Sequence, residues 1–212
     1  MTGAPRSPRN RCVRGFVAFL ATVGWLAFVP ATTVATNPAP EHLITGFSDA
    51  PNPDAIFYAI NKASAADSAP LRKAALAYIG DNDQKTRYAA LYALALTAKQ
   101  DDAEALAKFL TSPIADERLL AAATLAGLRD KRALPVLIAT LDQDEPLAYR
   151  EAGERASTFA QKQLLHFTSQ DFGLKAARTP EQIATTKPEW DRWWQKAGDS
   201  VHYDPQTRRF VE

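Results

Sequence analysis

The chain has 212 residues, of which 46% are hydrophobic and 23% are charged, and its formal net charge is +1. These values are close to the averages for soluble globular proteins, so a packed core is expected and a disordered chain is not. Residues 1–35 hold four of the 25 basic residues and no acidic residue, so residues 36–212 carry 21 basic and 24 acidic residues. That part has no basic surplus, and we expect no nucleic-acid partner.

An export signal is predicted at the N-terminus. Residues 1–14 are basic, residues 15–29 form an apolar run without a charge, and small residues follow Pro30. This order is typical of a secretory signal peptide, so residues 1–35 are interpreted as one and the mature chain as periplasmic or secreted. We expect cleavage after Ala35, or alternatively after Ala31. The apolar run is short for a membrane span, and an uncleaved signal that anchors the chain is the other interpretation.

Four regions are predicted after the signal. Residues 36–52 are rich in proline and small polar residues and predict a linker, and residues 53–167 carry a helical apolar pattern. Residues 168–199 predict a helical C-terminal cap, and residues 200–212 a loose tail. The single cysteine, Cys12, lies before the apolar run, so a cleaved chain has no thiol for a disulfide or for thiolate chemistry.

The pattern between residues 71 and 167 repeats three times. Each copy has an apolar helix, a short polar turn, an arginine and a second helix rich in small residues, and the turn of the third copy, at residues 142–146, holds one extra residue. The arginines are Arg87, Arg118 and Arg150, which are almost evenly spaced along the chain. One helix pair cannot cover its own apolar face, so the repeat predicts an all-α fold, a short α-solenoid (superhelix) of stacked antiparallel helix pairs.

Acidic residues recur at the turn of each copy. The relevant aspartates are Asp83, Asp116 and Asp144. We expect them to cap the following helix and to pair with the three arginines, forming a structural ladder between repeats. A row of carboxylates that binds calcium is the alternative interpretation.

One stretch carries a family resemblance. Residues 127–142, GLRDKRALPVLIATLD, resemble the HEAT-like repeats of the phycobilisome-lyase type, although the glycine precedes the leucine here. The resemblance covers nearly half of the chain and implies an α-solenoid. Such repeats occur in scaffolds, in chaperone-like factors and occasionally in enzymes. Arg150 is followed by Glu151, Ala152 and Gly153, which departs from the usual small apolar run, so the last repeat is interpreted as a capping unit.

The resemblance also implies that the second helices line the concave face of the array. Counted from the repeat arginines, the positions that would face a partner are Tyr88, Tyr92, Leu119, Glu151 and Arg155. Aromatic and charged side chains on one face are typical of partner recognition. Packing of Tyr88 and Tyr92 against the next repeat is the equally weighted alternative.

The predicted cap carries a tryptophan face. Trp190, Trp193 and Trp194 fall at i, i+3 and i+4 of a helix that Gly198 can end, after a possible start at Thr179 or a second one at Thr186. An array has an open apolar end, so the favoured interpretation is a hydrophobic lid. Stacking on a sugar or on peptidoglycan is the alternative.

The residues point to binding rather than catalysis. The three histidines are far apart in sequence and no nucleophile or phosphate-loop motif occurs, so we expect no catalytic residue, no metal and no cofactor. We therefore predict a non-catalytic protein–protein interaction or scaffold module of the cell envelope. The alternatives are an envelope enzyme accessory or carbohydrate-binding protein that uses the tryptophan face, and, from the resemblance alone, a chromophore lyase or chaperone-like factor.

Overall fold

A computed structural model describes residues 68–149 and 153–212 of the chain. The chain divides into two units, Met1–Ala35 and Thr36–Glu212, and every described residue belongs to the second. The predicted signal peptide, the linker, Arg150 and Glu151 lie outside the described residues. The described part is mostly helical, which confirms the prediction of an all-α fold, and it includes one small antiparallel sheet.

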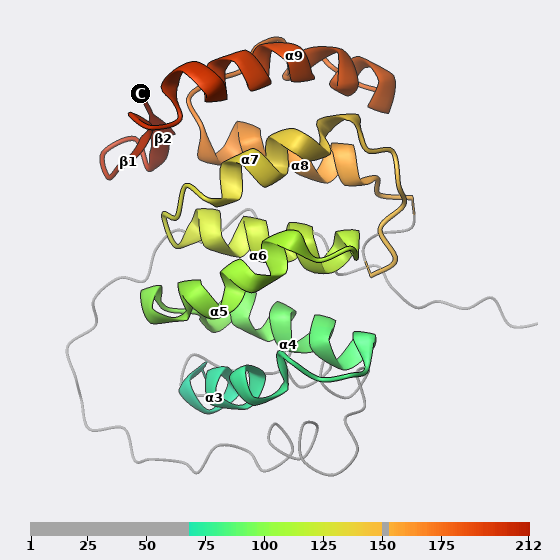
Figure 1. Ribbon diagram of the computed structural model, residues 1–212, viewed down its shortest axis with the longest axis vertical. Coiled ribbons are helices and arrows are strands. Elements are labelled where there is room, and N and C mark those ends of the chain that lie inside the picture. The colour runs from blue at the N-terminus through green and yellow to red at the C-terminus, as the bar shows by residue number, and fades with distance from the viewer. Residues whose placement is uncertain (1–67, 150–152) are drawn as a thin grey trace, which may run out of the picture. The chain divides into compact units, whose positions relative to one another are not determined.

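The helices follow one another as short elements joined by tight turns. They are α3 (Ser68–Tyr78), α4 (Gln84–Thr97), α5 (Ala103–Ala107), α6 (Ala115–Gly127), α7 (Ala133–Ala139), α8 (Ala156–Phe167) and α9 (Pro180–Ala197). Among the described residues, the 3₁₀ turns η2 (Gln100–Asp102) and η3 (Lys108–Thr111) flank α5, and the 3₁₀ turn η4 (Thr140–Asp142) follows α7. Each helix contacts its neighbours in the chain or the helix one further on, so α4 packs on α3 and α6, α6 on α5, α7 and α8, and α9 on α7 and α8 (Figure 1).

Alanine and leucine fill the interior between these helices. Ala89, Ala90, Ala93, Ala121 and Ala122 are fully buried, which allows close approach of the backbones. Leucines then occupy the remaining volume, and the fully buried ones include Leu91, Leu94, Leu106, Leu125, Leu134, Leu137 and Leu141. The close packing therefore follows from the small-residue pattern of the sequence.

The third copy of the sequence pattern folds differently from the first two. Helix α4 begins at Gln84, α6 at Ala115 and α8 at Ala156, so the interval before α8 is clearly the longer one. At the start of α8, the amides of Ala156 and Ser157 donate to the carbonyls of Glu145 and Gln143, so α8 is bonded to the segment that follows η4. The second helix of this copy that the structure describes, α8, begins at Ala156, and Arg150, which is expected to precede that helix directly, lies outside the described residues.

Helix α9 is one continuous helix. Thr179 caps it by accepting a hydrogen bond from the N–H of Gln182, and Pro180 occupies the first turn, as the sequence indicates. Pro188 lies inside the helix, so the alternative start near Thr186 is not used. The helix ends at Ala197, as Gly198 predicts.

The expected loose tail is instead a β-hairpin. Strand β1 (His202–Asp204) pairs antiparallel with β2 (Arg209–Val211), with Tyr203 opposite Phe210. Phe210 is only 1% exposed and its carbonyl accepts from the N–H of Ser169. Strands of three residues are too short to show a period-two pattern in the sequence. The buried Phe210 side chain packs this hairpin against the core.

Candidate functional site

Two sets of charge pairs connect helices that are well separated in sequence. The set on α4 and α6 begins with Arg87, whose guanidinium contacts the Glu117 carboxylate at 2.9 Å and donates to the carbonyls of Asp81 and Asn82. Glu117 is 3% exposed and also accepts from the hydroxyl of Ser112. We call this set, with its continuation below, the α4–α6 ladder.

The α4–α6 ladder continues from Arg118 toward the loop before α8. The Arg118 guanidinium donates to the Ser112 carbonyl at 2.8 Å, to Gln143 Oε1 at 3.0 Å and to Glu145 Oε1 at 3.1 Å. Arg87 in α4 and Arg118 in α6 therefore occupy equivalent positions, and each guanidinium contacts a segment further along the chain.

A second set joins α3, α5 and α7. Arg72 binds Asp102 through two bonds of 2.6 and 2.5 Å, although Asp102 is 3% exposed. Burial would raise the pKa of Asp102, but the hydrogen bonds from Arg72 and from the N–H of Lys99 outweigh it and lower that pKa overall. Glu104 on α5 then pairs with Arg132 before α7 at 2.9 Å. Both sets are interpreted as structural, because their charged groups bind one another between neighbouring segments.

One of the three predicted ladder aspartates, Asp83, has the expected capping role, and none of the three is the carboxylate that pairs with Arg87 or Arg118. Asp83 caps α4 by accepting from the N–H and hydroxyl of Thr86 at 2.8 Å, which lowers its pKa. Asp116 accepts from the amides of Ala148 and Tyr149 at 3.0 Å and so holds the loop before α8. Asp144 pairs with Arg155. The carboxylate partner of Arg87 is therefore Glu117 and not the predicted aspartate.

The predicted partner-binding residues do not gather on one exposed surface. Tyr88 and Leu119 are each 1% exposed, and the Tyr88 ring stacks on Tyr149 at 4.5 Å. Tyr92 is half-buried against the core, and Arg155 is engaged with Asp144. Tyr88 is therefore a packed core residue, which is the alternative that the sequence left open. Leu119 is also a core residue.

The tryptophan face points inward. Trp190 is fully buried, Trp193 is 7% exposed, and their rings meet edge to face at 5.6 Å. Phe172 packs against Trp190 at 5.1 Å, and the Trp193 indole N–H donates to Glu212 Oε1. Trp194 is half-exposed. The geometry fits a hydrophobic lid, and two of the three rings offer no open face for a sugar.

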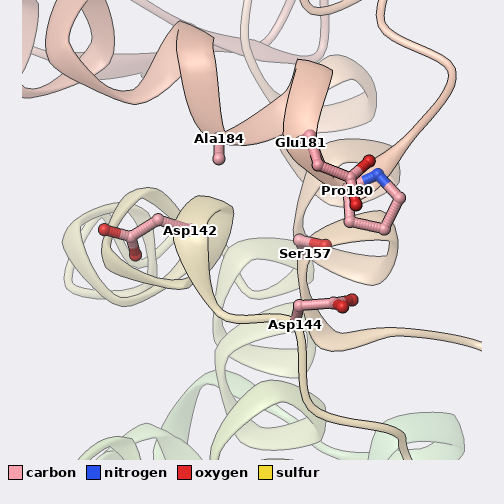
Figure 2. A pocket seen from close by; sticks show the side chains of 6 residues that line it. All are labelled: Asp142, Asp144, Ser157, Pro180, Glu181 and Ala184. Atoms are coloured by element: carbon pink, nitrogen blue, oxygen red, sulfur yellow. The ribbon is translucent and has the colours of Figure 1, made fainter.

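A pocket lies where η4, the loop after it, α8 and α9 meet. Its volume is about 190 Å³, and it is lined by Asp142, Asp144, Ser157, Pro180, Glu181 and Ala184. Figure 2 shows the Ser157 hydroxyl between the carboxylates of Asp144 and Glu181, while the Asp142 carboxylate points to the other side. Sequence reasoning missed this pocket, because its acids come from segments that only tertiary packing brings together.

The electrostatics of the pocket favour ionised acids. The Arg155 guanidinium, bound to Asp144 at 2.6 Å, lowers the pKa of that carboxyl. The hydroxyl of Thr179 and the backbone N–H of Glu181 lower the pKa of Glu181, while the nearby charge of Asp144 opposes them. Across residues 68–149 and 153–212, no group of three or more His, Cys, Asp or Glu side chains could hold a metal ion.

Comparisons with protein families, with curated proteins and with solved structures find no match for the chain. Within the described residues, each helix is too short or too polar to cross a membrane. The functional argument therefore depends on the geometry of this chain.

Proposed function

We propose that the protein is a non-catalytic interaction module, which uses a short α-solenoid of stacked antiparallel helix pairs to hold a protein partner. The observation that carries this proposal is the recurrence of the charge pairs. Arg72 reaches Asp102 and Arg87 reaches Glu117, each across the same separation in sequence. Bonds that recur at a constant offset are what stacked repeat units of one kind would form, since each unit contacts only its neighbours.

The HEAT-like resemblance of residues 127–142 supports the same class of architecture. Arrays of this kind bind partners through the extended surface that the stacked helices present, while their charged turns hold the units together. The placement of the protein in the cell envelope follows from the predicted export signal in residues 1–35. A protein partner, whose identity the chemistry does not define, fits this proposal better than a small substrate.

One exposed apolar position marks where a partner would contact the array. Leu96 is 45% exposed, and among the described residues it is the only large hydrophobic side chain that is exposed. It lies four residues after the half-buried Tyr92 on α4, so the two side chains share one face of that helix. An aromatic and an aliphatic side chain side by side are suited to serve as an interface anchor.

Site-specific photo-crosslinking in the native cell envelope tests this proposal. A photoreactive phenylalanine analogue replaces Leu96 in one variant and Lys73, an exposed residue of α3, in the control. We expect one dominant cross-linked protein from position 96, lost when Tyr92→Ala is added, and none of that product from position 73. Absence of a discrete product from both positions would contradict the interaction module.

A further inference from the structure

The pocket between α8 and α9 holds a polar group that the protein itself does not satisfy. Ser157 is 1% exposed, and its Oγ atom is buried without a hydrogen-bond partner. Leaving a buried hydroxyl unpaired is unfavourable, because the group has lost its bonds to water, so such groups are rare in native structures. The Ser157 hydroxyl lines the pocket, and a donor that enters the pocket would complete its bonding.

Local structure fixes this hydroxyl in place. Ser157 is the second residue of α8, and its N–H donates to the carbonyl of Gln143 at 3.1 Å, while the N–H of Ala156 donates to the carbonyl of Glu145 at 2.9 Å. These two bonds tie the start of α8 to the loop that carries Asp144. The carboxylate and the hydroxyl are therefore held on one rigid junction.

Acceptors and negative charge surround the same point. Asp144 and Glu181 flank the Ser157 hydroxyl (Figure 2), and the third carboxylate of the lining, Asp142, points away from it but adds its charge to the junction. Arg155 neutralises Asp144, and Lys187 lies 3.8 Å from Asp142 but also binds Asp191 at 2.8 Å. With three acids and two cations, one of them shared, the junction keeps a negative balance that favours a cationic ligand.

We propose that this pocket binds the ammonium group of a lysine side chain on the protein partner. The inference rests on the proposed function, since it names the chemistry of the partner. A lysine ammonium has three donors and no acceptor, which matches one hydroxyl and two carboxylates as three acceptors. Pro180 and Ala184 supply apolar wall for the methylene stem of the lysine.

A lysine fits this site better than a metal ion. Among the described residues no cluster of acids is arranged to hold a metal, and two of the three acids of the pocket are already engaged by Arg155 and Lys187. An ammonium donates a single hydrogen bond to each acceptor and leaves those ion pairs in place.

The test is a titration of the full chain, followed by backbone amide NMR shifts. The probe is the tripeptide acetyl-Gly-Lys-Gly-amide, and the matched neutral probe is acetyl-Gly-Gln-Gly-amide. We expect saturable shifts of Ser157 and Ala184 with the lysine peptide alone, weakened by added salt. Equal shifts with the glutamine peptide, or no saturable shift with either, would overturn the proposal.

Variants separate recognition from a structural role. Glu181→Gln should weaken lysine-peptide binding about tenfold, the usual effect of losing one charged hydrogen bond. Glu189→Gln is the matched control, because Glu189 lies on the same helix but pairs with Arg192 outside the pocket. A loss of equal size in the control variant would contradict the assignment.

Ser157→Ala gives the sharpest readout. It should weaken lysine-peptide binding and yet leave the free energy of unfolding of the free chain unchanged or higher, because it removes an unsatisfied buried hydroxyl. A serine that serves only the structure would lower stability and leave binding unaltered, which would overturn the inference. The peptide titration needs no native partner, so the two proposals can fail separately. A cross-link from position 96 without lysine-peptide binding refutes the lysine pocket alone. The reverse result refutes the proposed interaction module.

Discussion

Helices α3 to α6 and the region from α8 to the C-terminus hold their neighbours by different means. Between α3 and α6 the buried side chains are mostly alanine and leucine, and the guanidinium–carboxylate pairs Arg72–Asp102 and Arg87–Glu117 join the helices at their edges. In the C-terminal region, aromatic rings fill the interior. They belong to Phe159, Phe172, Trp190, Trp193 and Phe210.

The difference follows from what each region must cover. Helix α4 packs against α3 and α6, and α6 packs against α4, α5, α7 and α8, so small side chains let several backbones approach closely. Helix α9 packs against α7, α8 and η4. Bulky rings on α9, with Phe210 of the hairpin, supply most of the large apolar side chains that are buried there. Four substitutions test this comparison.

Trp190→Ala should have the largest effect on stability. The indole is fully buried against Phe172 and Trp193, and its removal leaves a cavity that costs about 3–5 kcal/mol of unfolding free energy. Urea denaturation followed by circular dichroism measures the loss. Trp194→Ala, at a half-exposed position of the same helix, is the control, and a larger loss there than at Trp190 would refute the lid.

Glu117→Gln tests the ladder between α4 and α6. The substitution keeps the shape but removes the charge that Arg87 and Ser112 bind, and we expect a loss of about 2–3 kcal/mol. Glu145→Gln is the matched control on the next rung, where the side chain is 46% exposed, and should cost less than about 1 kcal/mol. Similar losses of unfolding free energy for Glu117→Gln and Glu145→Gln would show that burial does not determine how much each ion pair stabilises the fold.

The Arg72–Asp102 pair predicts a pH dependence. The folded pKa of Asp102 is lowered, so this group stabilises the fold above its unfolded pKa of about 3.9 and loses that contribution as the pH falls through the folded pKa. The difference in urea midpoint between the native chain and Asp102→Asn should be constant near neutral pH and shrink below about pH 4. Asp101→Asn, at the exposed neighbour, serves as control, and a difference for Asp102→Asn that persists into strong acid would contradict the prediction.

Thr179→Ala should have the smallest effect. It removes the side-chain cap of α9 and should cost about 1 kcal/mol. Thr185→Ala, an exposed threonine of the same helix whose hydroxyl donates to the Gln182 carbonyl, is expected to change stability by less than about 0.5 kcal/mol. If the two losses are equal, the cap does not contribute more than an ordinary surface hydroxyl.

Much of the secondary structure could be predicted from local sequence. Asp83 and Thr179 both cap the helices that their positions indicate, and Trp190 and Trp193 of α9 share the buried face that their spacing implies. The start of α8 at Ala156 could not be predicted, because the arginine spacing in the sequence indicates an earlier start. The segment before α8 is held by the amides of Ala148 and Tyr149, which donate to the Asp116 carboxylate, a group far from them along the chain.

The site was less predictable than the fold. The sequence position of Tyr88 fits either an interface or the core. The structure shows that its side chain is buried and stacks on the Tyr149 ring. The pocket combines Asp144, Ser157 and Glu181 from three segments, and the turn pattern that includes Asp144 gives no sign of the other two. No periodicity marks a serine whose hydroxyl is left without a partner.

The sequence by itself determined that this chain forms helices, where several of them begin, and which faces are apolar, because caps and hydrophobic spacing act within one or two turns. Tertiary structure alone decided which carboxylate each arginine binds, that the C-terminal segment pairs as a hairpin, and that α8 and α9 enclose an acidic pocket. These outcomes depend on which distant segments pack together, and the free energy of that packing is a property of the whole arrangement rather than of any local pattern.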